Sequence, residues 1–101
     1  MNASDQKLVE RLATEADGAV EEGVILGLPA AAPEIAAIAV RRWRSFERRH
    51  RARGATFERR VDDLAKGLRQ RYPDPLNDEA WMMDLRDLAT RLGRVLASEG
   101  R

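Results

Sequence analysis

Apolar residues recur every three or four positions along most of this chain, and that spacing limits what it can fold into. The clearest example is the spacing 4-3-4-3 of Trp81, Leu85, Leu88, Leu92 and Val95. Side chains at i, i+3, i+4 and i+7 share one face of an α-helix, whereas a half-buried strand alternates at every second residue. The pattern therefore predicts an all-α protein.

Glycine and proline divide this periodic pattern into helical segments. We predict helices at about 4–22, 33–53, 56–72 and 77–99, with stops at Gly23, Gly54 and Pro73. The connections at 53–55 and 73–76 are short, and short connections favour antiparallel neighbours. We therefore expect a small antiparallel bundle of four helices that forms one domain over residues 1–101.

Local signals predict how the helices begin and how they are joined. Ser4 is the expected N-cap of the first helix, and Asn77 is the expected N-cap of the last. Gly18 lies inside the first helix and should weaken it. Leu76, just before the expected N-cap Asn77, and Trp81, four residues after it, occupy the two positions that pack together in a hydrophobic staple. The connector 23–32 is too apolar for free solvent, so we expect it to pack on the bundle through Val24, Ile25, Leu26 and Leu28.

The second predicted helix carries a row of arginines. On a helical projection they lie opposite and beside the apolar face that contains Trp43 and Phe46. We call six of them the arginine stripe: Arg41, Arg42, Arg44, Arg48, Arg49 and Arg51. Like-charged residues at i and i+4, such as Arg44 and Arg48, each destabilise a helix by a few tenths of a kcal/mol. The stripe is therefore the candidate binding site, and it favours an acidic counterpart.

The rest of the chain contains much of the acid that balances this charge. Residues 1–34 have a net charge of −5, residues 41–60 of +7 and residues 61–101 of −1, which sum to the +1 of the whole chain. Near-neutrality is therefore an average over regions of opposite sign.

Three interpretations of the stripe follow from this layout. It could be paired within the chain or merely solvated, with carboxylates of the first helix lying along it: Glu10, Glu15, Asp17, Glu21 and Glu22. It could bind an acidic surface of another protein or of a second copy of this chain, giving a homodimer, since arginine pairs with carboxylates bidentately. It could also follow the phosphates of DNA or RNA.

Two observations weigh against nucleic acid. The isoelectric point of about 8.3 is low for a dedicated nucleic-acid domain, and only two of the eighteen basic residues are lysine. The favoured function is a non-catalytic helical adapter, inhibitor or assembly protein that docks an acidic partner protein. DNA or RNA binding through the same arginines is the alternative. An accessory subunit of a multi-chain enzyme is a weaker one.

No residue pattern indicates catalysis, a metal or a cofactor. The chain has no cysteine and a single histidine, His50, at the end of an apolar face. Neighbouring carboxylates such as Asp84 and Asp87 lack the Glu-x-x-His motifs of di-metal bundles. The chain also begins without the basic and apolar stretches of a signal peptide. The apolar run 24–40 is shorter than the ~20 residues that a membrane span needs. We expect a cytoplasmic protein that does not bind membranes.

Overall fold

The computed structural model describes residues 2–50 and 56–99. Within them lie the helices α1 (Ala3–Glu21), α2 (Ala32–His50), α3 (Phe57–Arg71) and α4 (Asp78–Ser98). The predicted all-α bundle is confirmed, and the described helix bounds fall within one residue of the predicted ones except at the end of α2. Residues 51–53, the stop at Gly54 and the turn 53–55 lie outside the described residues.

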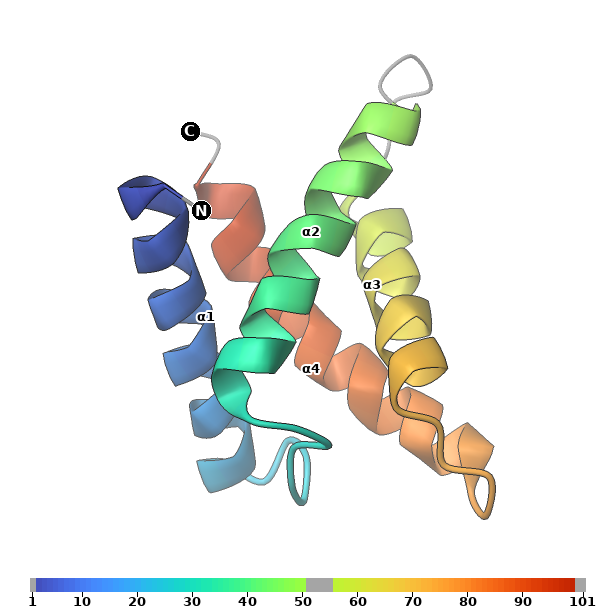
Figure 1. Ribbon diagram of the computed structural model, residues 1–101. Coiled ribbons are helices and arrows are strands. Elements are labelled where there is room, and N and C mark those ends of the chain that lie inside the picture. The colour runs from blue at the N-terminus through green and yellow to red at the C-terminus, as the bar shows by residue number, and fades with distance from the viewer. Residues whose placement is uncertain (1, 51–55, 100–101) are drawn as a thin grey trace.

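The helices alternate in direction along the chain (Figure 1). α2 lies between α1 and α3, and α4 crosses behind it at an oblique angle. α1 and α3 each pack against both α2 and α4, and they do not touch one another. The face of α2 that points away from α4 is therefore left without a covering helix.

The core is built from the apolar faces that the spacing predicts. Its largest fully buried side chains are Leu12, Ile25, Ile35, Leu64, Leu68, Leu85, Leu88 and Leu92. Trp43 and Phe46 are each 5% exposed, so the aromatic residues of α2 belong to the core side of that helix. Among the described residues no polar or charged residue is buried. Burial of the apolar face of α2 turns its opposite face, with the arginine stripe, to solvent.

Two of the predicted helix starts differ in detail. Asn2, and not Ser4, is the N-cap of α1, where its Oδ1 accepts a hydrogen bond of 2.8 Å from the backbone N–H of Asp5. Asn77 precedes α4 as predicted, but its side chain makes no capping hydrogen bond. The expected staple is absent because Leu76 is 95% exposed.

The connector between α1 and α2 packs on the bundle with one exception. It leaves α1 through Gly23, whose φ of 75° is a backbone conformation that favours glycine. Ile25 is 2% exposed and belongs to the core, and Val24 and Leu28 pack against it. The prediction was wrong for Leu26, which is 96% exposed. The chain bends at residues 24–26, and this bend turns Leu26 outward while Ile25 faces the core.

Candidate functional site

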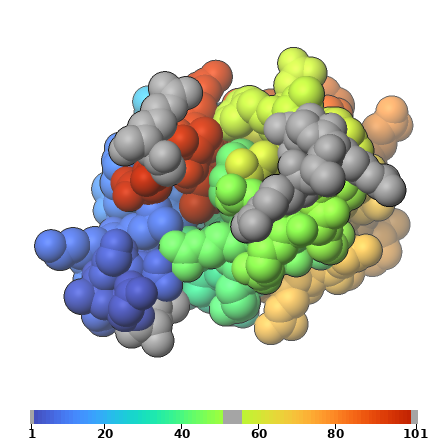
Figure 2. All heavy atoms as spheres, turned by 90° about the horizontal axis from the view of Figure 1, so that it is seen from above, coloured from blue at the N-terminus to red at the C-terminus, as the bar shows by residue number. Residues whose placement is uncertain are grey.

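The arginine stripe runs along the uncovered face of α2. Seen from the end at which α2 ends and α3 begins, the outer surface of α2 lies between α1 and α3 (Figure 2). Arg41, Arg44, Arg48 and Arg49 are exposed, and Arg42 is half-buried. The sixth member of the stripe, Arg51, lies outside the described residues. The helix therefore presents a cationic face, as predicted, and the surrounding carboxylates determine how much of its charge is free.

One carboxylate of α3 binds two of the stripe arginines. Arg42 donates to both oxygens of Asp63, with 2.9 Å from Nε and 3.1 Å from Nη2. Arg49 approaches the same carboxylate at 3.6 Å. The side chain of Asp63 is only 15% exposed, so water screens this cluster less than it screens an open surface pair. Asp63 thus fixes Arg42 and offsets part of the charge of Arg49.

A second carboxylate comes from the first turn of α1. Arg44 donates a hydrogen bond of 2.6 Å from Nη2 to Oδ1 of Asp5. This bond lowers the pKa of Asp5 from its ordinary value of 3.8 and raises the pKa of Arg44. Both side chains remain accessible, at 45% for Arg44 and 22% for Asp5. Exposed pairs of this kind contribute little to stability, so a stronger acidic partner could replace Asp5.

Two members of the stripe have no ion-pair partner among the described residues. They are Arg41 and Arg48, which lie seven positions apart on α2. Glu47 is the carboxylate of α2 that lies among these arginines in the sequence, and it contacts Arg60 of α3 at 3.5 Å. At 1.5 Å per residue the two free arginines are separated by about 10 Å along the helix axis. Their positive charges are therefore not neutralised by an ion pair within the described residues.

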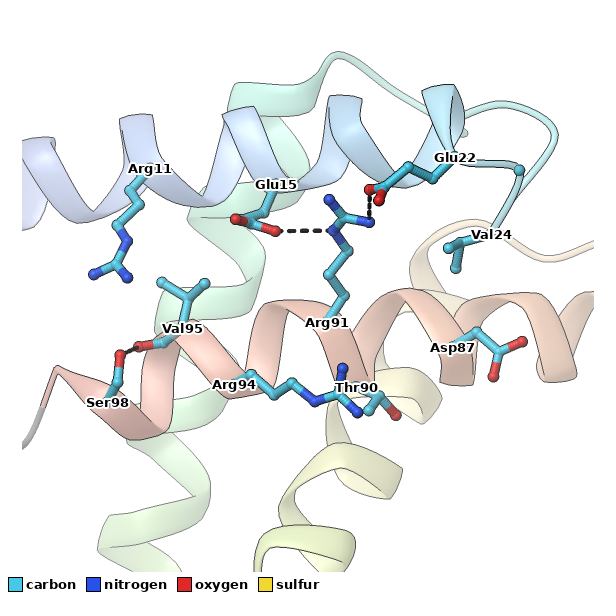
Figure 3. Close-up of a pocket in the computed structure, with 11 residues that line it drawn as sticks. Arg11, Glu15, Glu22, Val24, Asp87, Thr90, Arg91, Arg94, Val95 and Ser98 are labelled. Atoms are coloured by element: carbon cyan, nitrogen blue, oxygen red, sulfur yellow. Dashed lines mark hydrogen bonds and ion pairs between the residues drawn. The ribbon is translucent and has the colours of Figure 1, made fainter.

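The acid of α1 is directed mainly at α4 and not at the stripe. Arg91 of α4 reaches up between Glu15 and Glu22, donating from Nε to Glu15 at 2.8 Å and pairing with Glu22 through Nη1 (Figure 3). These hydrogen bonds, the one to Glu22 first, raise the pKa of Arg91. The groove of about 800 Å³ between α1 and α4 is therefore lined by charges of both signs. Of the described acidic residues of the first helix, only Asp5 meets the stripe.

A second groove, of about 490 Å³, lies between α2 and α3 beside the stripe. Its lining includes Arg41 and Arg42 of α2 and Arg71 of α3, and no acidic side chain. Arg71 and Asp63 have no sequence signal that links them to the stripe, because both belong to a helix that does not carry it. Only the packing of α3 against α2 brings them to it.

Beneath the stripe, Arg60 joins α3 to the core side of α2. Its guanidinium lies 4.0 Å from the ring centroid of Trp43, and its Nη2 donates to the carbonyl oxygen of Trp43 at 3.2 Å. Burial lowers the pKa of Arg60 from its ordinary value, although an arginine remains charged at neutral pH. This arginine is part of the scaffold that holds α2, and its charge is not offered to a ligand.

Comparison with protein-family models, with curated proteins and with solved structures gave no match. Within residues 2–50 and 56–99, no group of His, Cys, Asp and Glu side chains is arranged to hold a metal ion. None of the described helices combines the length and the apolar character needed to cross a membrane. The charged surfaces of α2 and α3 are therefore the features of the described residues that indicate a function.

Proposed function

We propose that this protein is a non-catalytic binding protein, an adapter, inhibitor or assembly factor, that docks an acidic surface of a partner protein through the arginine stripe. The observation that carries the proposal is the state of Arg41 and Arg48. Both are exposed, and neither has an ion-pair partner among the described residues. Arg44, between them, is held only by an exposed pair with Asp5, so it is available to a partner at small cost.

The carboxylates between these arginines favour a protein over a nucleic acid. The electrostatic part of nucleic-acid binding comes from Lys and Arg side chains that neutralise phosphates, so it depends on the number of cations that are not already paired. Here Asp63 already holds Arg42, and Asp5 and Glu47 also lie at the stripe. These negative charges would repel a continuous row of phosphates. A protein surface can place its own cations opposite them, as complementary interfaces do.

A second copy of this chain is one form that the acidic partner can take. Glu10, Asp17 and Glu21 of α1 are exposed and have no ion-pair partner among the described residues. The apolar face of α4, in contrast, is buried in the protein's own core. Self-association would therefore join the stripe of one copy to α1 of the other.

Affinity purification with matched charge variants tests the proposal. The stripe variant is Arg41→Gln/Arg48→Gln, and the control is Lys7→Gln/Arg94→Gln, which removes two exposed cations outside the stripe that likewise have no ion-pair partner among the described residues. Extracts are treated with nuclease and washed at about 150 mM salt, where the Debye length is about 8 Å. We expect the wild type and the control to retain the same acidic protein, or a second copy, and the stripe variant to lose it.

Two results would overturn the proposal. One is that the stripe variant retains the same partners as the wild type. The other is that binding disappears on nuclease treatment in every variant, which would make nucleic acid the ligand of the stripe.

A further inference from the structure

The groove between α2 and α3 has the composition of a site for a multiply charged oxyanion. It has a volume of about 490 Å³ and lies beside Arg41 and Arg42, the first two arginines of the stripe. It is lined by three arginines and two neutral side chains that can donate hydrogen bonds: Arg41, Arg42, Arg71, Ser45 and Gln70. None of the described residues that line it is a carboxylate, in contrast to the groove between α1 and α4, where Glu15 and Glu22 accompany Arg91.

Arg42 is held in place before any ligand arrives. Two hydrogen bonds to Asp63 employ its Nε and Nη2, which leaves Nη1 without a bond among the described residues. Gly67 of α3 makes room for this arrangement, because a Cβ there would lie 3.0 Å from Nε and 3.1 Å from Cδ of Arg42. Glycine inside a helix lowers helix stability by about 1 kcal/mol relative to alanine. The glycine at position 67 therefore costs α3 some stability, and in return it leaves room for the side chain of Arg42.

The other two arginines are bound weakly or not at all. Arg41 has no ion-pair partner among the described residues. Arg71 approaches Glu34 at 3.4 Å, while the hydroxyl of Tyr72 donates to the same carboxylate oxygen at 2.7 Å. Glu34 is thus engaged by Tyr72 and holds Arg71 only at the edge of hydrogen-bonding distance. Both cations can turn to a ligand without breaking a strong bond.

We propose that this groove binds a phosphate monoester, namely a phosphorylated serine or threonine side chain of the acidic partner. The inference rests on the proposed function and specifies which group of the partner is recognised. A phosphate monoester carries close to two negative charges at neutral pH and three strong acceptor oxygens, which match several guanidinium groups at once. A single carboxylate carries one charge and two acceptor oxygens, and one bidentate arginine can engage both of those oxygens, as Arg42 does with Asp63.

The test compares three short, labelled peptides that differ at one residue. Each is rich in aspartate and glutamate, with phosphoserine, glutamate or serine at its centre, and binding is followed by fluorescence anisotropy at about 150 mM salt. We expect the phosphoserine peptide to bind about tenfold more tightly than the glutamate peptide, as one additional charged hydrogen bond would provide.

Variants separate the groove from the rest of the protein. Arg71→Gln, at a side chain that is 64% exposed, should bring the phosphoserine peptide to the affinity of the glutamate peptide. Gly67→Ala should weaken the preference for phosphoserine without a change of net charge, because its Cβ would force Arg42, which Asp63 holds, to shift by a few tenths of an ångström. Arg94→Gln, an exposed arginine of α4, should leave the preference intact.

The outcomes distinguish the inference from the proposed function. If the phosphoserine and glutamate peptides bind equally and Arg41→Gln/Arg48→Gln weakens both, the proposed function stands and the phosphate site is overturned. If none of the three peptides binds, both the proposed function and the phosphate site are overturned. If Arg71→Gln and Arg94→Gln weaken the phosphoserine peptide equally, the preference reflects net charge and the groove is not a site. Competition by duplex DNA as effective as that by the phosphoserine peptide would also overturn the inference.

Discussion

At the scale of single residues, Asp63 has the largest effect on the charge of the stripe. It lies on α3, accepts two hydrogen bonds from Arg42 and approaches Arg49 at 3.6 Å. Repulsion among the arginines of α2 is thereby relieved from a neighbouring helix. Sequence analysis identified the arginines and their solvent-facing side, but the carboxylate that fixes them is set by tertiary packing. A residue 21 positions away in the chain gives no local signal of that contact.

We predict that Asp63→Asn lowers the free energy of unfolding by about 1–2 kcal/mol, since it removes a partly buried charged acceptor and leaves two arginines facing each other. Asp87→Asn is the matched control, because Asp87 is exposed and has no ion pair among the described residues. Urea unfolding followed by circular dichroism measures both. Equal losses for the two variants would show that Asp63 acts only through net charge.

A second residue-scale prediction concerns pH. The hydrogen bond from Arg44 lowers the pKa of Asp5 in the folded state from its ordinary value of 3.8. Because the folded pKa is the lower one, the stabilisation from Asp5 is complete above about pH 4 and is lost as the pH falls through the folded value. The difference in melting temperature between the wild type and Asp5→Asn should therefore be constant from pH 7 to about 4 and should shrink below it. A difference that grows on acidification would contradict the assignment.

At the scale of helices and loops, the sequence predicted where the helices lie but not how each end is finished. The three- and four-residue spacing of a helix is defined by many side chains together, so one atypical residue does not change the prediction. The predicted helix bounds therefore agree with the observed ones to within a residue wherever the structure describes them. A cap or a staple depends on one side chain. Asn2 caps the N–H of Asp5, so the helix begins before Ser4, and Leu76 needs a neighbour that the turn does not bring to it.

Gly18 shows the same limit for a residue inside a helix. From sequence it only weakens the first helix, whereas in the structure it provides the space that Arg91 occupies: a Cβ at this position would lie 2.6 Å from Nη2 of Arg91. The arginine can then bridge Glu15 and Glu22 and tie α1 to α4. Sequence periodicity cannot report such a fit, because the two residues are on different helices.

A double-mutant cycle tests this role of Gly18. Alanine is favoured over glycine within a helix by about 1 kcal/mol, so Gly18→Ala should stabilise the protein by about that amount when Arg91 is already alanine. In the wild-type background the displaced arginine should cancel most of the gain. Thermal unfolding of the four proteins of the cycle gives the coupling energy. A Gly18→Ala effect of the same size in both backgrounds would mean that Arg91 does not depend on this space.

At the scale of the whole molecule, most of the acid of the first segment, net −5, does not reach the stripe. Among the described residues, Glu15 and Glu22 pair with Arg91 of α4, and Asp5 is the one carboxylate of this segment that pairs with a stripe arginine. Sequence analysis left open whether this segment masks the stripe, because the periodicity of α1 does not say which neighbour its charged face meets. The described part of α2 therefore carries a cationic face on which Arg41 and Arg48 have no ion-pair partner, although the net charge of the chain is only +1.

The most direct test of that cationic face is fluorescence anisotropy on one protein preparation with three labelled ligands: an acidic peptide, duplex DNA and single-stranded RNA, all at about 150 mM salt. We predict that the peptide binds, that Arg41→Gln/Arg48→Gln abolishes its binding, and that neither nucleic acid is retained. Binding of DNA in preference to the peptide, falling with salt at a log–log slope near −0.9 for each phosphate contacted, would contradict the account and make the stripe a phosphate-backbone reader.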